Sequence, residues 1–361
     1  MIGKATMSEK DEVSNIYAIS LDTIHSREKV LESFKNALTH IHFRLLKIFD
    51  NEDIVGIKVD LLNDPVKSYL NDGFFKVITD YLKEKNTYPF FCDTTNRYKD
   101  RKNNFISFYQ NAINCNLGGP KAETPFNTLD GINGLYEIAR EVPGSKFKKS
   151  ITHLAGGLQN LDGMIVFSKL KCHNMAGCSG TIMSLGMGLA GKMGKTKLFS
   201  KTPPRVNESK CSYCRKCLHR CPVNAITVDE ISRHAFIDKT KCINCGKCVD
   251  VSKFGSITYD WNADPEHFQT QLVENAVAAT SMINTNKQLY INFLMEPEDL
   301  DLNQTKIDGF KGILISKDPL AIDKASNDLI GNRCQFGELI FEYVHELNLG
   351  KLKYKIHHIA Y

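Results

Sequence analysis

The chain has 361 residues, 42% of them hydrophobic and 24% charged, a balance typical of a soluble globular protein with a sizeable core. The net charge is only +5 and the basic residues are spread along the chain, so a nucleic-acid partner, which needs a dense basic patch, is not expected. No stretch reaches the ~20 apolar residues of a membrane span, and the first dozen residues are polar. The sequence therefore predicts a cytoplasmic protein without a membrane partner.

Strand and helix signals alternate in the first part of the chain. Strands are expected at 15–21, 54–61, 89–92 and 163–168. Amphipathic helices are expected at 23–49 and 65–85, and an apolar helix follows the last of these strands.

The alternation stops at a polar, proline-containing linker at 201–210 and resumes after a cysteine-rich segment. Beyond that segment, strands are expected at 288–294 and 312–316, and helices at 264–283, 319–330 and 335–347. Alternating elements predict an α/β fold with a largely parallel sheet covered by helices. The cysteine-rich segment is then a small α+β insert at 205–260, and 1–204 and 261–361 form the two parts of one α/β domain.

Seven of the twelve cysteines fall in two tight runs, which are Cys211-x2-Cys214-x2-Cys217-x3-Cys221-Pro222 and Cys242-x2-Cys245-x2-Cys248. In a chain without an export signal, such spacing indicates thiolate metal ligands rather than disulfides. Zinc ribbons also use Cys-x2-Cys pairs, but three cysteines at consecutive x2 spacing followed by Cys-Pro favour a ferredoxin-like module with two iron–sulfur clusters.

One of the two clusters has all its ligands. In such modules the fourth ligand of each run serves the other cluster. A complete [4Fe–4S] cluster is therefore expected on four thiolates, those of Cys221, Cys242, Cys245 and Cys248.

The other cluster, bound by Cys211, Cys214 and Cys217, lacks its fourth thiolate, because the corresponding position of the second run is serine. Three outcomes are open. The site holds a [3Fe–4S] cluster, or one iron of a [4Fe–4S] cluster is open to substrate as a Lewis acid, or another group supplies the ligand. The candidate groups are Ser252, Cys172 and Cys178.

A second constellation follows the strand at 163–168, where α/β sheets place ligand sites. Lys171 and His173 supply a cation and a proton donor or acceptor there. Asp93 ends another strand, in the segment Asp93-Thr94-Thr95-Asn96. These three residues are the expected catalytic residues of the α/β domain. The alternatives are a tight loop with a solvated basic edge for the first segment, and helix capping or a turn for the second.

Together these segments resemble the family of iron–sulfur centre proteins known as domain of unknown function 362, which often carries a ferredoxin insert. The resemblance covers nearly the whole chain. It rests on Asp93-Thr94 with Tyr98 and Arg101, Lys171 with His173, 177–180, 186–188, the cysteine runs, and Asp318-Pro319 with Ala321 and Asp323. Asp323 is expected to favour the positive end of the helix that Pro319 begins.

The chain departs from that family at three places. Cys172 stands where relatives have glycine, Cys178 where they commonly have an aromatic residue, and Leu300-Asp301-Leu302 where they often have Cys-Asp-Cys. The resemblance implies no particular activity.

The function that the sequence predicts is an oxygen-sensitive oxidoreductase that relays electrons through two clusters to a site in the α/β domain. One alternative is a non-redox lyase, isomerase or sulfur-transfer enzyme that uses an open iron. Another is a non-enzymatic electron carrier or assembly factor. The partner is a redox protein or a small-molecule substrate. No P-loop and no G-x-G-x-x-G after a strand is present, and flavin stays open because its binding has no single short signature.

Overall fold

The structure is a computed structural model. The residues that it describes are 13–20, 27–39, 45–61, 72–96, 104–142, 144–145, 151–294, 312–331 and 337–359.

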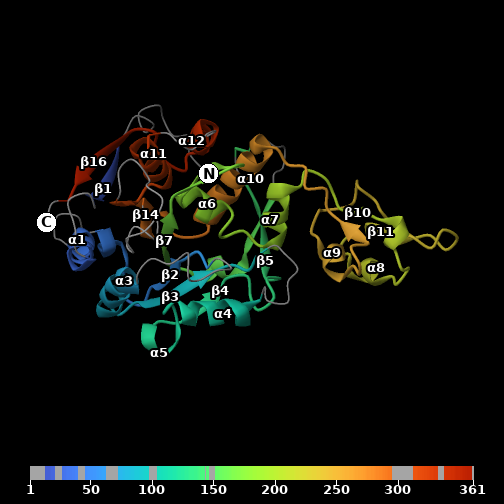
Figure 1. Cartoon of the computed structure of the whole chain (residues 1–361), viewed down its shortest axis with the longest axis horizontal. Helices are drawn as coiled ribbons and strands as arrows, with labels where there is room; N and C mark the ends of the chain where they lie inside the picture. Colours follow the sequence, from blue (N-terminus) through green and yellow to red (C-terminus); the bar gives the residue numbers. More distant parts are fainter. Residues whose placement is uncertain are drawn as a thin grey trace.

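An eight-stranded sheet runs through the larger part of the molecule (Figure 1), with the strand order β16-β1-β15-β14-β7-β2-β3-β4. Every neighbouring pair is parallel except the two that involve β15, which is antiparallel to both β1 and β14. The strands are β1 (Ser14–Ser20), β2 (Ile54–Lys58), β3 (Tyr88–Asp93), β4 (Phe126–Thr128), β7 (Gly163–Lys169), β14 (Gln288–Leu294), β15 (Gly312–Ser316) and β16 (Tyr354–His358). The predicted α/β fold with a largely parallel sheet is confirmed.

Both faces of the sheet are buried. Along β7, Met164 and Val166 belong to one hydrophobic cluster, whereas Ile165 and Phe167 belong to the other. This alternation follows from the two-residue period of a strand, and it makes the strand a continuous apolar run in the sequence.

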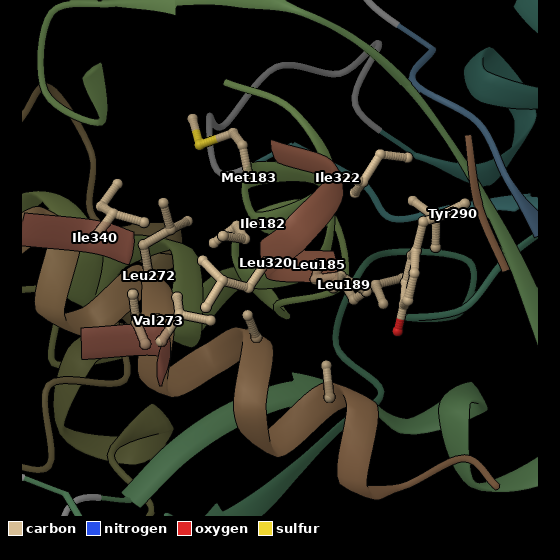
Figure 2. Packing of buried hydrophobic residues seen from close by; sticks show 14 of the residues in the cluster. Ile182, Met183, Leu185, Leu189, Leu272, Val273, Tyr290, Leu320, Ile322 and Ile340 are labelled. Atoms are coloured by element: carbon tan, nitrogen blue, oxygen red, sulfur yellow. The ribbon is translucent and has the colours of Figure 1, made fainter. Parts of the chain in front are cut away.

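Helices cover each face. The side chains of α1 (Arg27–Thr39), α3 (Asp72–Glu84) and α4 (Phe105–Asn114) join the cluster of Ile165. Those of α6 (Thr181–Gly186), α10 (Pro265–Ser281), α11 (Pro319–Leu329) and α12 (Gly337–Glu346) join the cluster of Met164. Figure 2 shows this second layer, in which Ile182 of α6 lies between Leu272 of α10 and Leu320 of α11.

Shorter elements complete the α/β part. They are η1 (Leu45–Ile48), α5 (Gly119–Ala122), β5 (Glu137–Glu141), β6 (Ile151–Ala155), η2 (Gly156–Asn160), β8 (Lys171–His173), β9 (Gly177–Ser179), α7 (Lys192–Phe199) and η4 (Thr285–Lys287). Within the described ranges, no helix has both the length and the apolar character needed to cross a bilayer.

The cysteine runs lie in a separate small body at the right of Figure 1. Its hydrophobic core is centred on Cys217, Cys248, Ile226 and Ile257. Two short antiparallel pairs, β10–β13 and β11–β12, frame two helices. The elements are β10 (Arg205–Val206), η3 (Glu208–Lys210), α8 (Lys216–Arg220), β11 (Ile226–Val228), β12 (Ala235–Ile237), α9 (Lys247–Val251) and β13 (Ile257–Thr258). We call this body the cysteine module.

The two segments that enter and leave the cysteine module run side by side. Ser200 donates to the Asp260 carbonyl over 2.8 Å, and the Lys201 N–H donates to the Asn262 side chain over 3.1 Å. Arg205 and Asp260 form an ion pair at 2.9 Å. These contacts hold together the two chain segments that connect the module to the α/β part.

Two helix predictions need correction. The single helix expected at 23–49 is wrong at its end, because Leu45–Ile48 forms a 3₁₀ turn that buries Leu45 and Leu46. The single apolar helix expected after β7 is divided into α6 and α7. A side chain at Gly186, the last residue of α6, would meet the Leu272 carbonyl oxygen at 2.1 Å, so α6 and α10 cross there at backbone distance. The strands at 54–61, 89–92 and 163–168 are confirmed to within three residues.

Candidate functional site

Charged side chains gather where three neighbouring parallel strands end. Lys58 is the last residue of β2, Asp93 is the last residue of β3, and Asp130 follows β4 by two residues. The chain steps from β2 to β3 and β4 on one side, whereas β7 lies on the other side of β2. Such a reversal of strand order is where open α/β sheets bind ligands, outside the carboxyl ends of the strands.

Lys58 and Asp93 form a buried ion pair. The Lys58 Nζ lies 2.9 Å from the Asp93 Oδ1, and both side chains are less than a tenth exposed. The Asp93 carboxylate also accepts the Leu61 and Thr94 N–H groups, each over 2.8 Å. Burial lowers the pKa of Lys58, but Asp93 and Asp60 outweigh it, so the pKa stands above its usual value and the lysine stays charged.

Lys195 of α7 reaches the same edge from the other side. Its Nζ donates to the Thr94 Oγ1 over 2.6 Å and to the Thr95 carbonyl over 2.5 Å. Asp130 accepts the Thr95 N–H and hydroxyl, the latter over 2.6 Å. Burial lowers the pKa of Lys195 and raises that of Asp130, and each opposes the shift of the other. We call Lys58, Asp93, Asp130 and Lys195 the buried charge cluster.

The backbone at Gly188 packs directly against the buried charge cluster. Thr94 donates its hydroxyl proton to the Gly188 carbonyl over 2.8 Å. A side chain at Gly188 would meet the Ser184 carbonyl oxygen at 2.3 Å and the Lys58 Nζ at 3.0 Å, so only glycine fits there. The glycine-rich segment after α6 therefore serves close packing against Lys58.

Of the expected site residues, only Asp93 belongs to this cluster. Sequence reasoning missed Lys58, Asp130 and Lys195. Lys58 carried a usable signal, because a lysine that ends a buried apolar strand needs an anionic partner. The sequence around Lys195 gave no such signal, because Lys-Met-Gly-Lys-Thr-Lys is typical of a solvated basic helix.

Glu137 is the first residue of β5, and its carboxylate accepts the N–H of Met193 at the start of α7 over 2.7 Å. Burial, with a smaller contribution from Asp130, raises the pKa of Glu137 to about 7 against the opposing effects of the Met193 N–H, Lys195 and Lys247. Lys247 belongs to the cysteine module, so Glu137 lies within electrostatic range of both that module and the buried charge cluster.

The pKa of Glu137 gives a testable pH dependence. The folded state binds this proton more tightly than the unfolded state, so the free energy of unfolding should fall as the pH rises from about 4.5 to about 7, and level off above. Glu137→Gln should remove this part of the slope in urea unfolding measured at pH 5, 6, 7 and 8. Glu141→Gln, an exposed position on the same strand, is the control and should keep the slope. Equal slopes for wild type and Glu137→Gln would contradict the assignment.

Lys171 and His173 lie on the hairpin of β8 and β9 that follows β7. The His173 Nδ1 accepts the Met175 and Ala176 N–H groups over 3.2 and 3.1 Å, and its ring stacks on Phe268 at 5.5 Å. Within the described residues, no hydrogen bond or ion pair joins His173 to Asp93. The side chain of Lys171 lies outside the described part of the structure.

These contacts support a structural contribution of His173. His173→Ala removes two hydrogen bonds of its own turn and a ring stack, so we expect the free energy of unfolding to fall by about 1–3 kcal/mol. Urea unfolding measures this, with the exposed His219→Ala as the control. Unchanged stability together with loss of ligand binding would instead support the catalytic role expected from the sequence.

The last helix prediction concerns Asp323, which lies at the positive end of α6, not of α11. Its carboxylate accepts the Thr181 and Ile182 N–H groups over 2.7 and 2.8 Å and the Asn292 amide over 2.7 Å. The N-cap of α11 is Asp318. The side chain of Asp323 points from α11 into the core, so it caps α6, the helix that packs against α11.

The two cysteine runs have the same backbone. Tyr213 and Arg215 flank the second cysteine of the first run with positive φ, and Asn244 and Gly246 flank that of the second run in the same way. This conformation turns amide groups inward, and successive inward amides form anion-binding concavities. The Lys216 and Lys247 N–H groups donate to the sulfurs of the second cysteines, the arrangement that cluster sulfurs require.

Cys221 lies with the cysteines of the second run. Burial raises the pKa of Cys242, and among the groups that raise it further are Cys245 and Cys221; Cys221 also raises the pKa of Cys245. The Cys221 sulfur accepts the Ala225 N–H over 3.2 Å. The residues present therefore fit a cluster at this place with four thiolates.

A small hollow opens beside the first run. Cys211, Cys214 and Cys217 line it, and Ser252 faces them from the end of α9. The Ser252 hydroxyl lies 2.9 Å from the Val249 carbonyl and 3.3 Å from the Ile257 carbonyl, as a donor. No cysteine other than these three is among the residues described around the hollow.

Cys172 is disulfide-bonded, so it is not free to complete that site. Within the described residues, no three His, Cys, Asp or Glu side chains converge closely enough to hold a single metal ion. A cubane does not require such convergence, because each thiolate binds its own iron.

A family model described as "Domain of unknown function (DUF362)" matches residues 55–328 of the chain. That range includes the whole buried charge cluster and all seven cysteines of the two runs.

Relatives and solved structures match over part of their length. The chain is 33% identical over 72 residues to NADH-quinone oxidoreductase subunit I 2 of Symbiobacterium thermophilum, which covers 17% of this chain and 30% of that protein. The lactate racemase apoprotein from Thermoanaerobacterium thermosaccharolyticum aligns at a TM-score of 0.41 and 10% identity, covering 81% of this chain and 53% of that one. A protein from Thermotoga maritima aligns at 0.42 and 10%, covering 87% and 59%. The chain thus spans less than a third of the curated relative and little more than half of the solved structures.

Proposed function

This chain belongs to the DUF362 family, and from that premise we propose that it is an iron–sulfur oxidoreductase whose cysteine module passes electrons to the buried charge cluster. When bound, the clusters supply one-electron transfer. Cys221, Cys242, Cys245 and Cys248 hold the complete [4Fe–4S] cluster. Cys211, Cys214 and Cys217 hold the other, with a non-cysteine group at the fourth position.

The observation that carries the proposal is the position of α7 between the two sites. Lys195 and Lys197 lie two residues apart on one helix, so their side chains leave it about 200° apart. Lys195 enters the buried charge cluster. Lys197 lies close enough to Cys245 for the two to interact electrostatically: burial lowers the pKa of Lys197, while Glu137 and Cys245 raise it. α7 is therefore the element through which the cysteine module and the buried charge cluster approach each other.

The chain's own residues at the buried charge cluster do three things. Lys58 and Lys195 supply two buried positive charges, and Asp93 and Asp130 hold them in place. In a water-poor site such charges interact strongly with a developing charge on a substrate. Burial lowers the pKa of Lys195, whereas the pKa of Lys58 is raised, so Lys195 is the lysine of the two better able to give up a proton.

The test is anaerobic. The purified protein is analysed for iron and sulfide and reduced with dithionite, and small carboxylates and phosphates are screened for those that speed reoxidation of the clusters. A compound that does so should lose its effect in Lys195→Met and keep it in Lys192→Met, a lysine of the same helix outside the buried charge cluster. Electron paramagnetic resonance should show the clusters unchanged in both variants. Turnover that needs no reductant would refute the proposal.

One observation favours a second candidate function. The hollow at Cys211 has three described thiolates and a serine, so an iron without a thiolate would be open to a substrate as a Lewis acid. In that case the protein is a non-redox lyase, isomerase or sulfur-transfer enzyme, and turnover persists with both clusters held oxidised.

A further inference from the structure

The hairpin after β7 holds a cysteine that the proposed function does not use. Cys172 is exposed and disulfide-bonded. In the register of the hairpin, Lys171 pairs with Ser179, Cys172 with Cys178, and His173 with Gly177. The residue directly opposite Cys172 is therefore a second cysteine.

The partner of Cys172 follows by elimination. The chain has twelve cysteines, and nine of those described are free thiols. Apart from Cys172 itself, this leaves Cys178 and Cys334, whose side chains both lie outside the described part of the structure. Directly opposed residues of an antiparallel pair have Cα atoms about 4.5–5.5 Å apart, which is within the ~4.4–6.8 Å that a disulfide spans. The register thus assigns Cys178 as the partner.

Such a bond is unusual beside clusters. The seven cysteines of the two runs bind iron only as thiolates, so the holoprotein needs a reducing environment. Disulfides in reducing compartments are mostly transient, with a catalytic or redox-sensing role, and exposed disulfides are the labile ones. Cys172 is exposed, so its bond is open to reduction.

The hairpin is also connected to the cysteine module through α10. Neighbouring residues of a strand point to opposite faces, so Cys172 faces solvent while His173 stacks inward on Phe268. The adjacent His267 lies with its Nε2 2.9 Å from the Lys197 carbonyl. Lys197 interacts with Cys245. Direct contacts thus lead from the hairpin through α10 to Lys197, which lies within electrostatic range of Cys245.

We propose that Cys172 and Cys178 form a redox-active pair that is reduced by electrons from the cysteine module. The S–S bond breaks on taking up two electrons, delivered one at a time, and two protons from solvent produce two thiols. An external low-potential one-electron donor supplies the electrons to the clusters. The inference rests on the proposed function, because it takes the clusters as the internal reductant.

The experiment reads the state of the sulfurs rather than activity. Anaerobic protein is alkylated before and after reduction by photoreduced deazaflavin, digested without reductant, and analysed by mass spectrometry. We expect a linked Cys172–Cys178 peptide before reduction and alkylation of both residues after it. Cys245→Ala, which lacks a ligand of the complete cluster, should keep the link under the same reduction. Cys115→Ser, a free thiol of the α/β part, is the control and should behave as wild type.

Several outcomes would overturn the inference. Cys172 could be linked to Cys334, or Cys172 and Cys178 could both be alkylated before reduction, or the link could be reduced equally in Cys245→Ala. If Cys245→Ala fails to fold, Cys221→Ala takes its place. If the clusters of the wild-type protein are reduced but the Cys172–Cys178 link stays intact, this inference is contradicted and the proposed function is not. If the wild-type protein contains no iron and sulfide, the proposed function is contradicted as well, and the digest still shows whether the two cysteines are linked.

Discussion

Cys221→Ala is expected to remove the complete [4Fe–4S] cluster, about half of the bound iron, and to leave the cluster at Cys211 in place. Cys221 follows the first run in sequence, but its sulfur lies with Cys242 and Cys245 of the second run. Alanine leaves those thiolates one ligand short. Iron and sulfide analysis with electron paramagnetic resonance of anaerobically purified protein measures the loss.

The matched control is Cys115→Ala, because Cys115 is a half-buried free thiol far along the chain from either run. It should retain both clusters and the wild-type iron content. A Cys221→Ala protein that keeps the all-cysteine cluster and loses the cluster at Cys211 would show that ligation follows sequence order instead of crossing.

Much of the sheet could be predicted from the sequence, for a physical reason. Strands such as β14 and β15 are buried on both faces, so they appear as largely apolar runs, with Asn292 as the one polar residue inside β14. Both were predicted with their observed bounds. The short β4 and the edge strand β16 give no such run, because one has three residues and the other contains a lysine and two histidines among its five residues.

The buried charge cluster could not be predicted as a whole. The Nζ of Lys195 bonds to Thr94, 101 residues earlier in the chain, and Asp130 bonds to Thr95 from 35 residues away. Hydrophobic periodicity places each residue on its own element, but it does not report which polar residues meet when the elements pack. Asp93 was found only because it ends a strand, which is a local signal.

Asp323 makes the same point. The rule that carboxylates favour helix N-termini is local, and it points to the helix on which Asp323 lies. The structure satisfies the rule with α6, whose first N–H groups lie more than 140 residues earlier. Likewise, His173 follows a strand as expected, yet its Nδ1 is engaged by the turn of its own hairpin.

Sequence spacing predicts most in the cysteine module, because the loops that carry the cluster ligands are formed by residues close together in the sequence. Even there, spacing alone leaves open what replaces the missing thiolate. The structure contributes the surroundings of Ser252. It lines the hollow with Cys211, Cys214 and Cys217, and it stands at the end of α9 as Cys221 stands at the end of α8.

The last prediction concerns this serine. Ser252→Cys should convert the cluster at Cys211 into an ordinary [4Fe–4S] cluster with four thiolates. A thiol with pKa ~8.5 is readily deprotonated, whereas an alcohol is not, so serine is a poor substitute ligand. If the native site holds three irons, the variant gains one iron per chain and loses the three-iron signal of the oxidised protein. If the native site has an open catalytic iron, the iron content stays the same and turnover is abolished.

Ser232→Cys is the control, because Ser232 is exposed in the turn between β11 and β12 and lies outside the hollow. It should leave iron content, spectra and any turnover as in wild type, which excludes a general effect of adding a thiol to the module. Iron analysis and electron paramagnetic resonance of both variants decide the matter. An experimental structure of the native holoprotein with four cysteine sulfurs around the cluster at Cys211 would show that Ser252 replaces nothing and would end this interpretation.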